Sequence, residues 1–196
     1  MSAENLSETW KAGFISLLRT SEQSEVLKVA SLVGDLRTWT AVLTAMVIDS
    51  CGTMGWQAAA KSHRLDLLPV MRNEYLSLDV VAFHGTVKGW QMPAAIFELE
   101  NSPQDNMVAY ALWKLLCVRA PLRVLFCYRK DPEEGAALVR QIQQEVIRKI
   151  PPEERIRMDG NTILCIGNRG HAGTFPFDFF RWWQVDAGSG TCSRKV

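Results

Sequence analysis

Residues 76–83, Leu-Ser-Leu-Asp-Val-Val-Ala-Phe, and residues 93–100, Pro-Ala-Ala-Ile-Phe-Glu-Leu-Glu, decide the predicted fold. Each segment is short and mostly apolar, and each is followed by turn-forming residues, a pattern that predicts a β-strand. The two glycines within residues 84–89 predict a turn, and residues 87–92 can form a further short strand. The sequence therefore predicts a strand meander in the middle of the chain.

Helices and strands alternate after this meander. Residues 101–103, Asn-Ser-Pro, end the second strand and can start a helix that runs to about residue 118. Residues 123–128, Arg-Val-Leu-Phe-Cys-Tyr, form an apolar run typical of a strand buried on both faces. A helix over 131–150 and a last core strand at 162–166 complete the pattern. Because strand–helix–strand units pair in parallel, we expect an α/β fold with a mixed central sheet flanked by helices.

The two ends of the chain differ in character. The first fifty residues predict three helices, the second ending at Gly34, and residues 56–65 predict a fourth, short one. Residues 175–183 contain six aromatic side chains, for which core packing is favoured over base stacking, and residues 188–196 predict a loose tail. We expect one domain over 1–196. It comprises an N-terminal helical extension (1–53), a core (54–168), and an aromatic C-terminal segment with the tail (169–196).

Composition narrows the class of protein. The chain has 196 residues, of which 47% are hydrophobic and 22% charged, as in an ordinary globular domain. No apolar run approaches the roughly 18 residues of a membrane helix, and the N-terminus lacks a signal-peptide pattern, so we expect a cytoplasmic protein without a membrane partner. The five cysteines are widely spaced and include no Cys-x-x-Cys, which argues against a zinc knuckle. A net charge of +1 gives little support to nucleic-acid binding and does not exclude it.

Three acidic residues interrupt the two deciding strands. Asp79 lies within the first, and Glu98 and Glu100 lie in the second. Side chains alternate along a strand, so Glu98 and Glu100 share one face while Phe97 and Leu99 share the other. A buried carboxylate costs several kcal/mol unless it is paired, and a hard cation such as Mg²⁺ would relieve that cost. Carboxylates that face solvent at strand ends, or that pair with arginines, are the alternative.

Residues 78–81, Leu-Asp-Val-Val, followed by residues 96–102, Ile-Phe-Glu-Leu-Glu-Asn-Ser, resemble the core of the PD-(D/E)XK nuclease superfamily. The resemblance covers about residues 56–128. It implies a restriction-endonuclease-like fold and hydrolysis of DNA or RNA phosphodiester bonds with Mg²⁺ or Mn²⁺. It also implies that Asp79 and Glu98 bind the metal, with the Leu99 carbonyl as a further ligand.

The chain departs from the family pattern at Glu100, which stands where the family has a lysine. A lysine would polarise the attacking water, whereas Glu100 can act as a base or as an extra metal ligand. Lys114, on the predicted helix that follows, is a candidate for a migrated lysine, although a solvated helix lysine is the simpler account. Glu74, five residues before Asp79, would point to the opposite face of a continuous strand.

Three functions follow from these residues. The first is a metal-dependent nuclease with Asp79, Glu98, Glu100 and Lys114 as catalytic candidates; since many relatives act as dimers, a homodimer fits the resemblance. The alternative is a catalytically inactive nuclease-fold module that binds nucleic acid or protein, which the loss of the family lysine favours. The third is an unrelated α/β protein whose strand acids are solvated.

Overall fold

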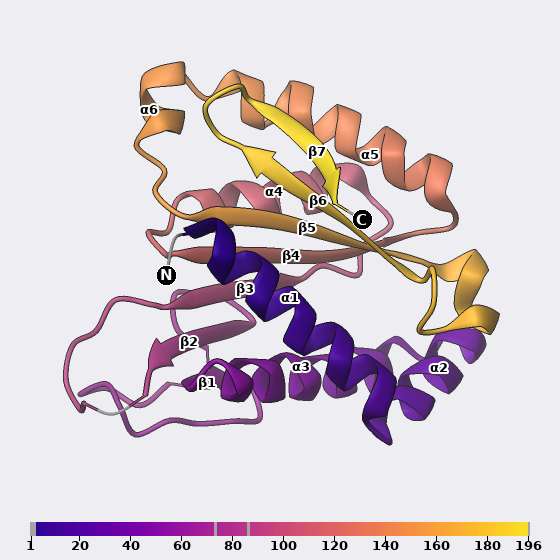
Figure 1. Cartoon of the computed structure of the whole chain (residues 1–196), viewed down its shortest axis with the longest axis horizontal. Helices are drawn as coiled ribbons and strands as arrows, with labels where there is room; N and C mark the ends of the chain where they lie inside the picture. Colours follow the sequence, from indigo (N-terminus) through magenta and orange to yellow (C-terminus); the bar gives the residue numbers. More distant parts are fainter. Residues whose placement is uncertain (1–2, 73, 86, 196) are drawn as a thin grey trace.

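The computed structural model describes residues 3–72, 74–85 and 87–195, and a mixed β-sheet forms its centre (Figure 1). Seven strands lie across this sheet in chain order: β1 (Trp56–Ala60), β2 (Val80–His84), β3 (Ala95–Leu99), β4 (Leu122–Arg129), β5 (Asn161–Asn168), β6 (Phe180–Asp186) and β7 (Thr191–Lys195). β3, β4 and β5 run parallel, and the other neighbours pair antiparallel. The predicted α/β class, mixed sheet and parallel pairing are confirmed.

Three helices precede the sheet, as predicted: α1 (Ala3–Thr20), α2 (Gln23–Val33) and α3 (Leu36–Thr53). α2 ends at Gly34, whose φ of 72° suits glycine and whose N–H donates to the carbonyl of Ala30. α3 begins directly after Asp35, whose carboxylate accepts the N–H of Thr38 at 3.1 Å. Within the described ranges, no helix is both long and apolar enough to cross a membrane.

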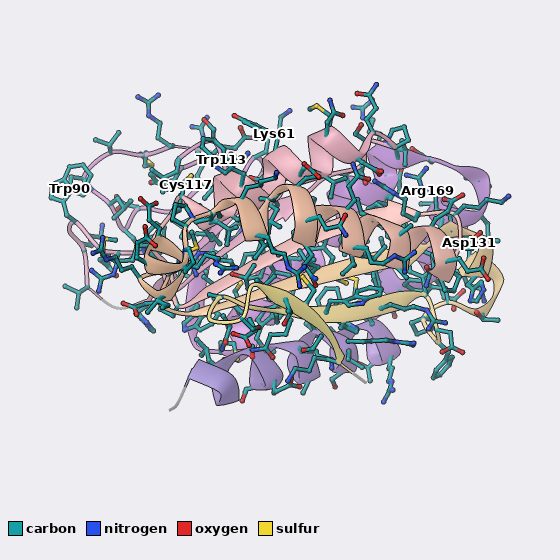
Figure 2. All side chains as sticks on the ribbon, turned by 90° about the horizontal axis from the view of Figure 1, so that it is seen from above. Lys61, Trp90, Trp113, Cys117, Asp131 and Arg169 are labelled. Atoms are coloured by element: carbon teal, nitrogen blue, oxygen red, sulfur yellow. The ribbon has the colours of Figure 1, made fainter. Side chains whose placement is uncertain are left out.

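Helices cover both faces of the sheet. Figure 2 shows the sheet nearly edge-on, with α1 on one side and α4 (Asp105–Leu116) and α5 (Pro132–Glu145) on the other. Side chains of α1, α2 and α3 form one core with Phe97 and Phe126, and side chains of α4 and α5 form a second core with Ile96 and Leu125. The N-terminal helices are therefore one of the two layers that bury the sheet.

α5 is shorter than predicted. Asp131 caps its first turn by accepting the N–H groups of Glu133 and Glu134, each at 2.9 Å, and Pro132 follows at the first helical position. The α-helix ends at Glu145 rather than near residue 150, and the chain continues as a 3₁₀ turn, η1 (Ile147–Lys149). Two further short elements are α6 (Pro152–Ile156) and η2 (Arg169–Thr174).

The helix predicted over residues 56–65 is wrong. Residues 56–60 form β1, which pairs with β2 from Trp56 opposite His84 to Ala60 opposite Val80. The sequence Trp-Gln-Ala-Ala-Ala favours a helix by intrinsic propensity. Pairing with β2 and packing under α3 override that preference, because the small alanines let the helix approach the sheet edge closely.

Three predictions for other segments also need correction. The strand at 162–166 is not the last, since β6 and β7 follow it, and the supposed tail forms the edge strand β7 up to Lys195; residue 196 lies outside the described residues. Residues 87–92 form no strand. The aromatic run lacks the polar alternation of a half-buried strand because both faces of β6 are aromatic. Trp182 packs in the core beneath α1, α2 and α3, and Trp183 packs in the core beneath α4 and α5. The predicted core role of the aromatic segment is otherwise confirmed, with Phe177 exposed.

Candidate functional site

The pairing of β2 with β3 brings the two central acids together. Val80 lies opposite Phe97 in this antiparallel pair, so Asp79, one residue before β2, lies across from Glu98 in β3. Phe97 and Leu99 pack in the α1 core, as the predicted alternation requires, and Glu98 takes the other face of the sheet, the side that α4 covers. Asp79 and Glu98 therefore meet beneath α4, on two neighbouring strands.

Two hydrogen bonds fix these side chains. The N–H of Leu99 donates to Oδ2 of Asp79 at 2.7 Å, and the N–H of Asp79 donates to Oε1 of Glu98 at 3.3 Å. Each carboxylate thus accepts a backbone N–H from the strand that carries the other. This reciprocal arrangement fixes the two carboxylates in position through the backbone of both strands.

Lys114 completes the site from α4. Its ammonium lies 2.8 Å from Oε2 of Glu98 and donates to the carbonyl of Ser77 at 2.8 Å. The lysine side chain is 24% exposed and the Glu98 side chain 8%. The interpretation of Lys114 as a solvated helix lysine is therefore wrong. Its position three residues after the buried Ala111 places it at the border of the apolar stripe of α4, and that spacing was the signal in the sequence.

Burial changes the acidity of both carboxyl groups. Loss of hydration raises the pKa of Glu98 to about 7, which the hydrogen bond from Lys114 opposes and the charge of Asp79 reinforces. Loss of hydration also raises the pKa of Asp79, against the hydrogen bond from Leu99 and the charge of Lys114. The positive charge of Lys114 thus does not fully offset the desolvation of the two neighbouring carboxyl groups.

This raised pKa predicts how stability depends on pH. The folded-state pKa of Glu98 lies above its ordinary value of 4.5, so the free energy of unfolding falls as pH rises from about 4.5 to 7. Glu98→Gln removes this loss of stability. The melting temperature of the variant minus that of the natural chain should therefore increase from pH 5 to pH 8, as measured by thermal unfolding in EDTA. Glu145→Gln, at an exposed position of α5, is the matched control. Parallel pH profiles for the natural chain and Glu98→Gln would contradict the prediction.

The third acid, Glu100, is held differently. Its N–H donates to the carbonyl of Phe126 in β4 at 2.9 Å, and its Oε1 accepts the N–H of Ser102 at 2.7 Å, in the loop before α4. Its charge still raises the pKa of Asp79. Over the described part of the chain, no group of three or more His, Cys, Asp or Glu side chains is placed to hold an ion. The hydrogen bonds described above thus connect Asp79 and Glu98 and do not include Glu100. The role of Glu100 as a further metal ligand stays a prediction.

The direction of the Leu99 carbonyl, predicted as a further metal ligand, follows from that of the Leu99 N–H. The N–H of Leu99 points to Asp79, and the N–H and C=O of one residue in an extended strand point to the same side. The carbonyl of Leu99 therefore faces the side of the sheet edge where Asp79 lies. With the two carboxylates, it gives a donor set made of oxygens alone.

Glu74 lies nearer the site than the sequence suggested. The expected opposite orientation assumed a continuous strand, but Leu76 and Ser77 have φ angles of 58° and 54°, and β2 begins only at Val80. These left-handed residues turn the chain before the strand. The negative charge of Glu74 consequently acts on Asp79 and raises its pKa.

Comparison with known proteins adds no relative to this description: no family profile, no curated protein and no solved structure matches the chain significantly.

Proposed function

We propose that the chain is a nuclease-like protein with a restriction-endonuclease-like fold that hydrolyses phosphodiester bonds of DNA or RNA with Mg²⁺ or Mn²⁺. The observation that carries the proposal is the meeting of Asp79, Glu98 and Lys114, with Lys114 Nζ 2.8 Å from Glu98 Oε2. The order antiparallel β2–β3, helix α4, parallel β4 supports it, because the resemblance to the PD-(D/E)XK core implies this sequence of elements.

The residues present fit a hard divalent cation. Asp79, Glu98 and the Leu99 carbonyl offer only oxygen donors, which Mg²⁺ prefers. Both carboxyl groups are desolvated with raised pKa values, so additional positive charge beside them is favourable. When bound, the metal would activate water and neutralise charge on the phosphate. The protein's part is to hold both carboxylates fixed through the N–H groups of Leu99 and Asp79.

Lys114 supplies the positive charge that the strand lacks at Glu100. Its ammonium reaches the site from α4 and is anchored by the Ser77 carbonyl, so it can donate to a phosphate oxygen close to Glu98. The departure at Glu100 therefore removes the lysine from the strand without removing positive charge from the site.

The second candidate function, a catalytically inactive nuclease-fold module, also has a specific observation in its favour. Lys114 and Glu98 form a mostly buried ion pair, which neutralises Glu98 without any metal. If this ion pair takes the place of the metal, the protein keeps the fold and does not catalyse hydrolysis.

The test compares the natural chain with Asp79→Asn on single-stranded and duplex DNA and RNA, in EDTA, Mg²⁺ or Mn²⁺. Asparagine keeps an oxygen for the Leu99 N–H and removes the charge, so metal-dependent cleavage should fall by about 100-fold or more. Asp49→Asn, at an exposed position of α3, should cleave like the natural chain. Absence of cleavage by the natural chain with either metal would support the inactive module instead.

A further inference from the structure

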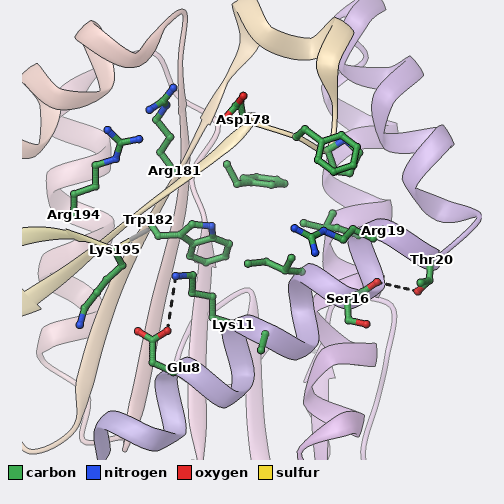
Figure 3. A pocket seen from close by; sticks show the side chains of 16 residues that line it. Glu8, Lys11, Ser16, Arg19, Thr20, Asp178, Arg181, Trp182, Arg194 and Lys195 are labelled. Atoms are coloured by element: carbon green, nitrogen blue, oxygen red, sulfur yellow. Dashed lines mark hydrogen bonds and ion pairs between the residues drawn. The ribbon is translucent and has the colours of Figure 1, made fainter.

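A groove of about 810 Å³ lies between α1 and the strands β6 and β7, remote in the sheet order from the β2–β3 pair (Figure 3). Residues of α1 line one side, and residues of β6, β7 and the segment 176–178 line the other. Its volume falls in the range of ligand sites, about 300–1,000 Å³. The groove is therefore large enough for more than a single small ion.

Positive charge is concentrated in this groove. Five cationic side chains line it: Lys11, Arg19, Arg181, Arg194 and Lys195. Glu8 and Asp178 are the acids in the lining, so the lining residues, counted over both faces of β6 and β7, carry a net charge of +3, five cations less two acids. The whole chain carries +1, so everything outside the groove sums to −2. This local excess of positive charge is what a nucleic-acid-binding surface requires, and the net charge of the whole chain does not reveal it.

The protein's own carboxylates leave most of this charge uncompensated. Glu8 lies 3.8 Å from the ammonium of Lys11. For Arg19, Arg181 and Arg194, no ion pair is found within the residues that the structure describes. Nε of Arg181 is buried and lacks a hydrogen-bond acceptor there as well. The exposed guanidinium groups of Arg19 and Arg194 can therefore meet anionic oxygens supplied by a ligand.

An exposed aromatic ring lies among these cations. The side chain of Phe177 is 63% exposed, whereas Trp182, deeper in the groove, is buried. The guanidinium of Arg19 lies over the Phe177 ring, 6.0 Å from its centroid. An exposed ring beside a cation is a combination with which proteins bind single-stranded nucleic acid, since a base stacks on the ring and phosphates meet the charges.

The strand register spreads the cations along a path. Lys195 lies opposite Trp182, on the face toward α1, and Arg194 lies opposite Trp183, on the other face. Arg181 alternates with Trp182 and so shares the face of Arg194. Because β7 is the edge strand, positive charge continues from the groove around the edge of the sheet. Successive phosphates of one strand could follow this path.

We propose that the groove binds single-stranded nucleic acid, with backbone phosphates against the cations and one base against Phe177. A duplex hides the faces of its bases, so Phe177 favours a single strand. The surface is separate from the Asp79 and Glu98 site, which lies on the α4 side of the sheet. This binding proposal goes beyond the proposed function, since a catalytically inactive module would bind single-stranded nucleic acid in the same way.

The test measures binding in EDTA, where no metal-dependent cleavage occurs. Fluorescence anisotropy with labelled oligothymidine and oligouridine compares the natural chain with the double variant Arg19→Glu, Arg194→Glu. This variant reverses one exposed cation on α1 and one on the edge strand β7. The affinity should fall about tenfold or more, and the slope of log affinity against log salt should become shallower by about 0.7 for each phosphate that the variant no longer binds. The matched control is Lys61→Glu, Arg140→Glu, at two exposed positions outside the groove.

Phe177→Ala separates strand binding from general attraction to polyanions. It should weaken oligothymidine binding by about fivefold or more and leave binding of inorganic polyphosphate unchanged. Equal losses of affinity in the groove variant and the control variant would overturn the proposal. Duplex binding as tight as single-strand binding, with no effect of Phe177→Ala, would overturn it too. Asp79→Asn should bind like the natural chain, so that loss of cleavage and loss of binding are told apart.

Discussion

Lys114→Met is expected to lower the rate of metal-dependent phosphodiester cleavage by about 100- to 1,000-fold, the usual cost of removing one preorganised charge donor from a site of this kind. The lysine ammonium lies 2.8 Å from Glu98 and is held by the Ser77 carbonyl, and within the described residues no other lysine forms an ion pair with Glu98. Methionine retains much of the unbranched stem and loses the charge together with the ammonium contacts to Glu98 and Ser77. Single-turnover cleavage with saturating Mg²⁺ measures the chemical step directly.

The control for this prediction is Lys28→Met. Lys28 forms an ion pair on the surface of α2, 3.9 Å from Glu25, and exposed pairs of this type contribute little. It should cleave at the natural rate. If Lys114→Met cleaves within about twofold of the natural chain, the lysine has no part in the chemistry, and its pairing with Glu98 is structural.

Trp10→Ala is expected to lower the free energy of unfolding by about 3–5 kcal/mol. Trp10, in α1, is fully buried, and its ring lies 5.5 Å from that of Phe14 and 5.2 Å from that of Phe97. Its indole N–H donates to Ser50 in α3 at 3.0 Å. Alanine would leave a cavity between α1, α3 and the sheet. Domains have about 5–15 kcal/mol of stability in all, so urea unfolding should show a large shift.

The same substitution tests the role of the N-terminal helices. Phe97 directly precedes Glu98 in β3, so a loosened α1 should also weaken binding of Mn²⁺ at the candidate site. Val29→Ala, at a position of α2 that is 56% exposed, should change the stability by less than about 1 kcal/mol. A destabilisation below about 1 kcal/mol for Trp10→Ala would show that residues 1–53 are an appendage rather than a layer of the fold.

The sequence predicted elements best where hydrophobic pattern and local chemistry agree. The continuous apolar run of β4 marked a strand buried on both faces, and Gly34 marked the end of α2. β1 escaped prediction because its alanines favour a helix until β2 pairs with them. β6 escaped because its aromatic side chains serve two cores at once, which removes the polar alternation that marks a half-buried strand.

The sequence by itself determined that Asp79 and Glu98 are costly side chains among apolar neighbours, because an ionised carboxylate in apolar surroundings needs compensation wherever its segment lies. Only the tertiary structure decided what compensates them. The register of β2 against β3 sets the two acids across from each other, and α4 delivers Lys114 to Glu98. Likewise, the near-zero net charge was evident from the composition, whereas the basic groove arises only when α1 and the β6–β7 edge, from opposite ends of the chain, lie side by side. The charge of each side chain follows from the identity of the residue. The electrostatic interaction between two side chains depends on their distance, which only the folded chain fixes.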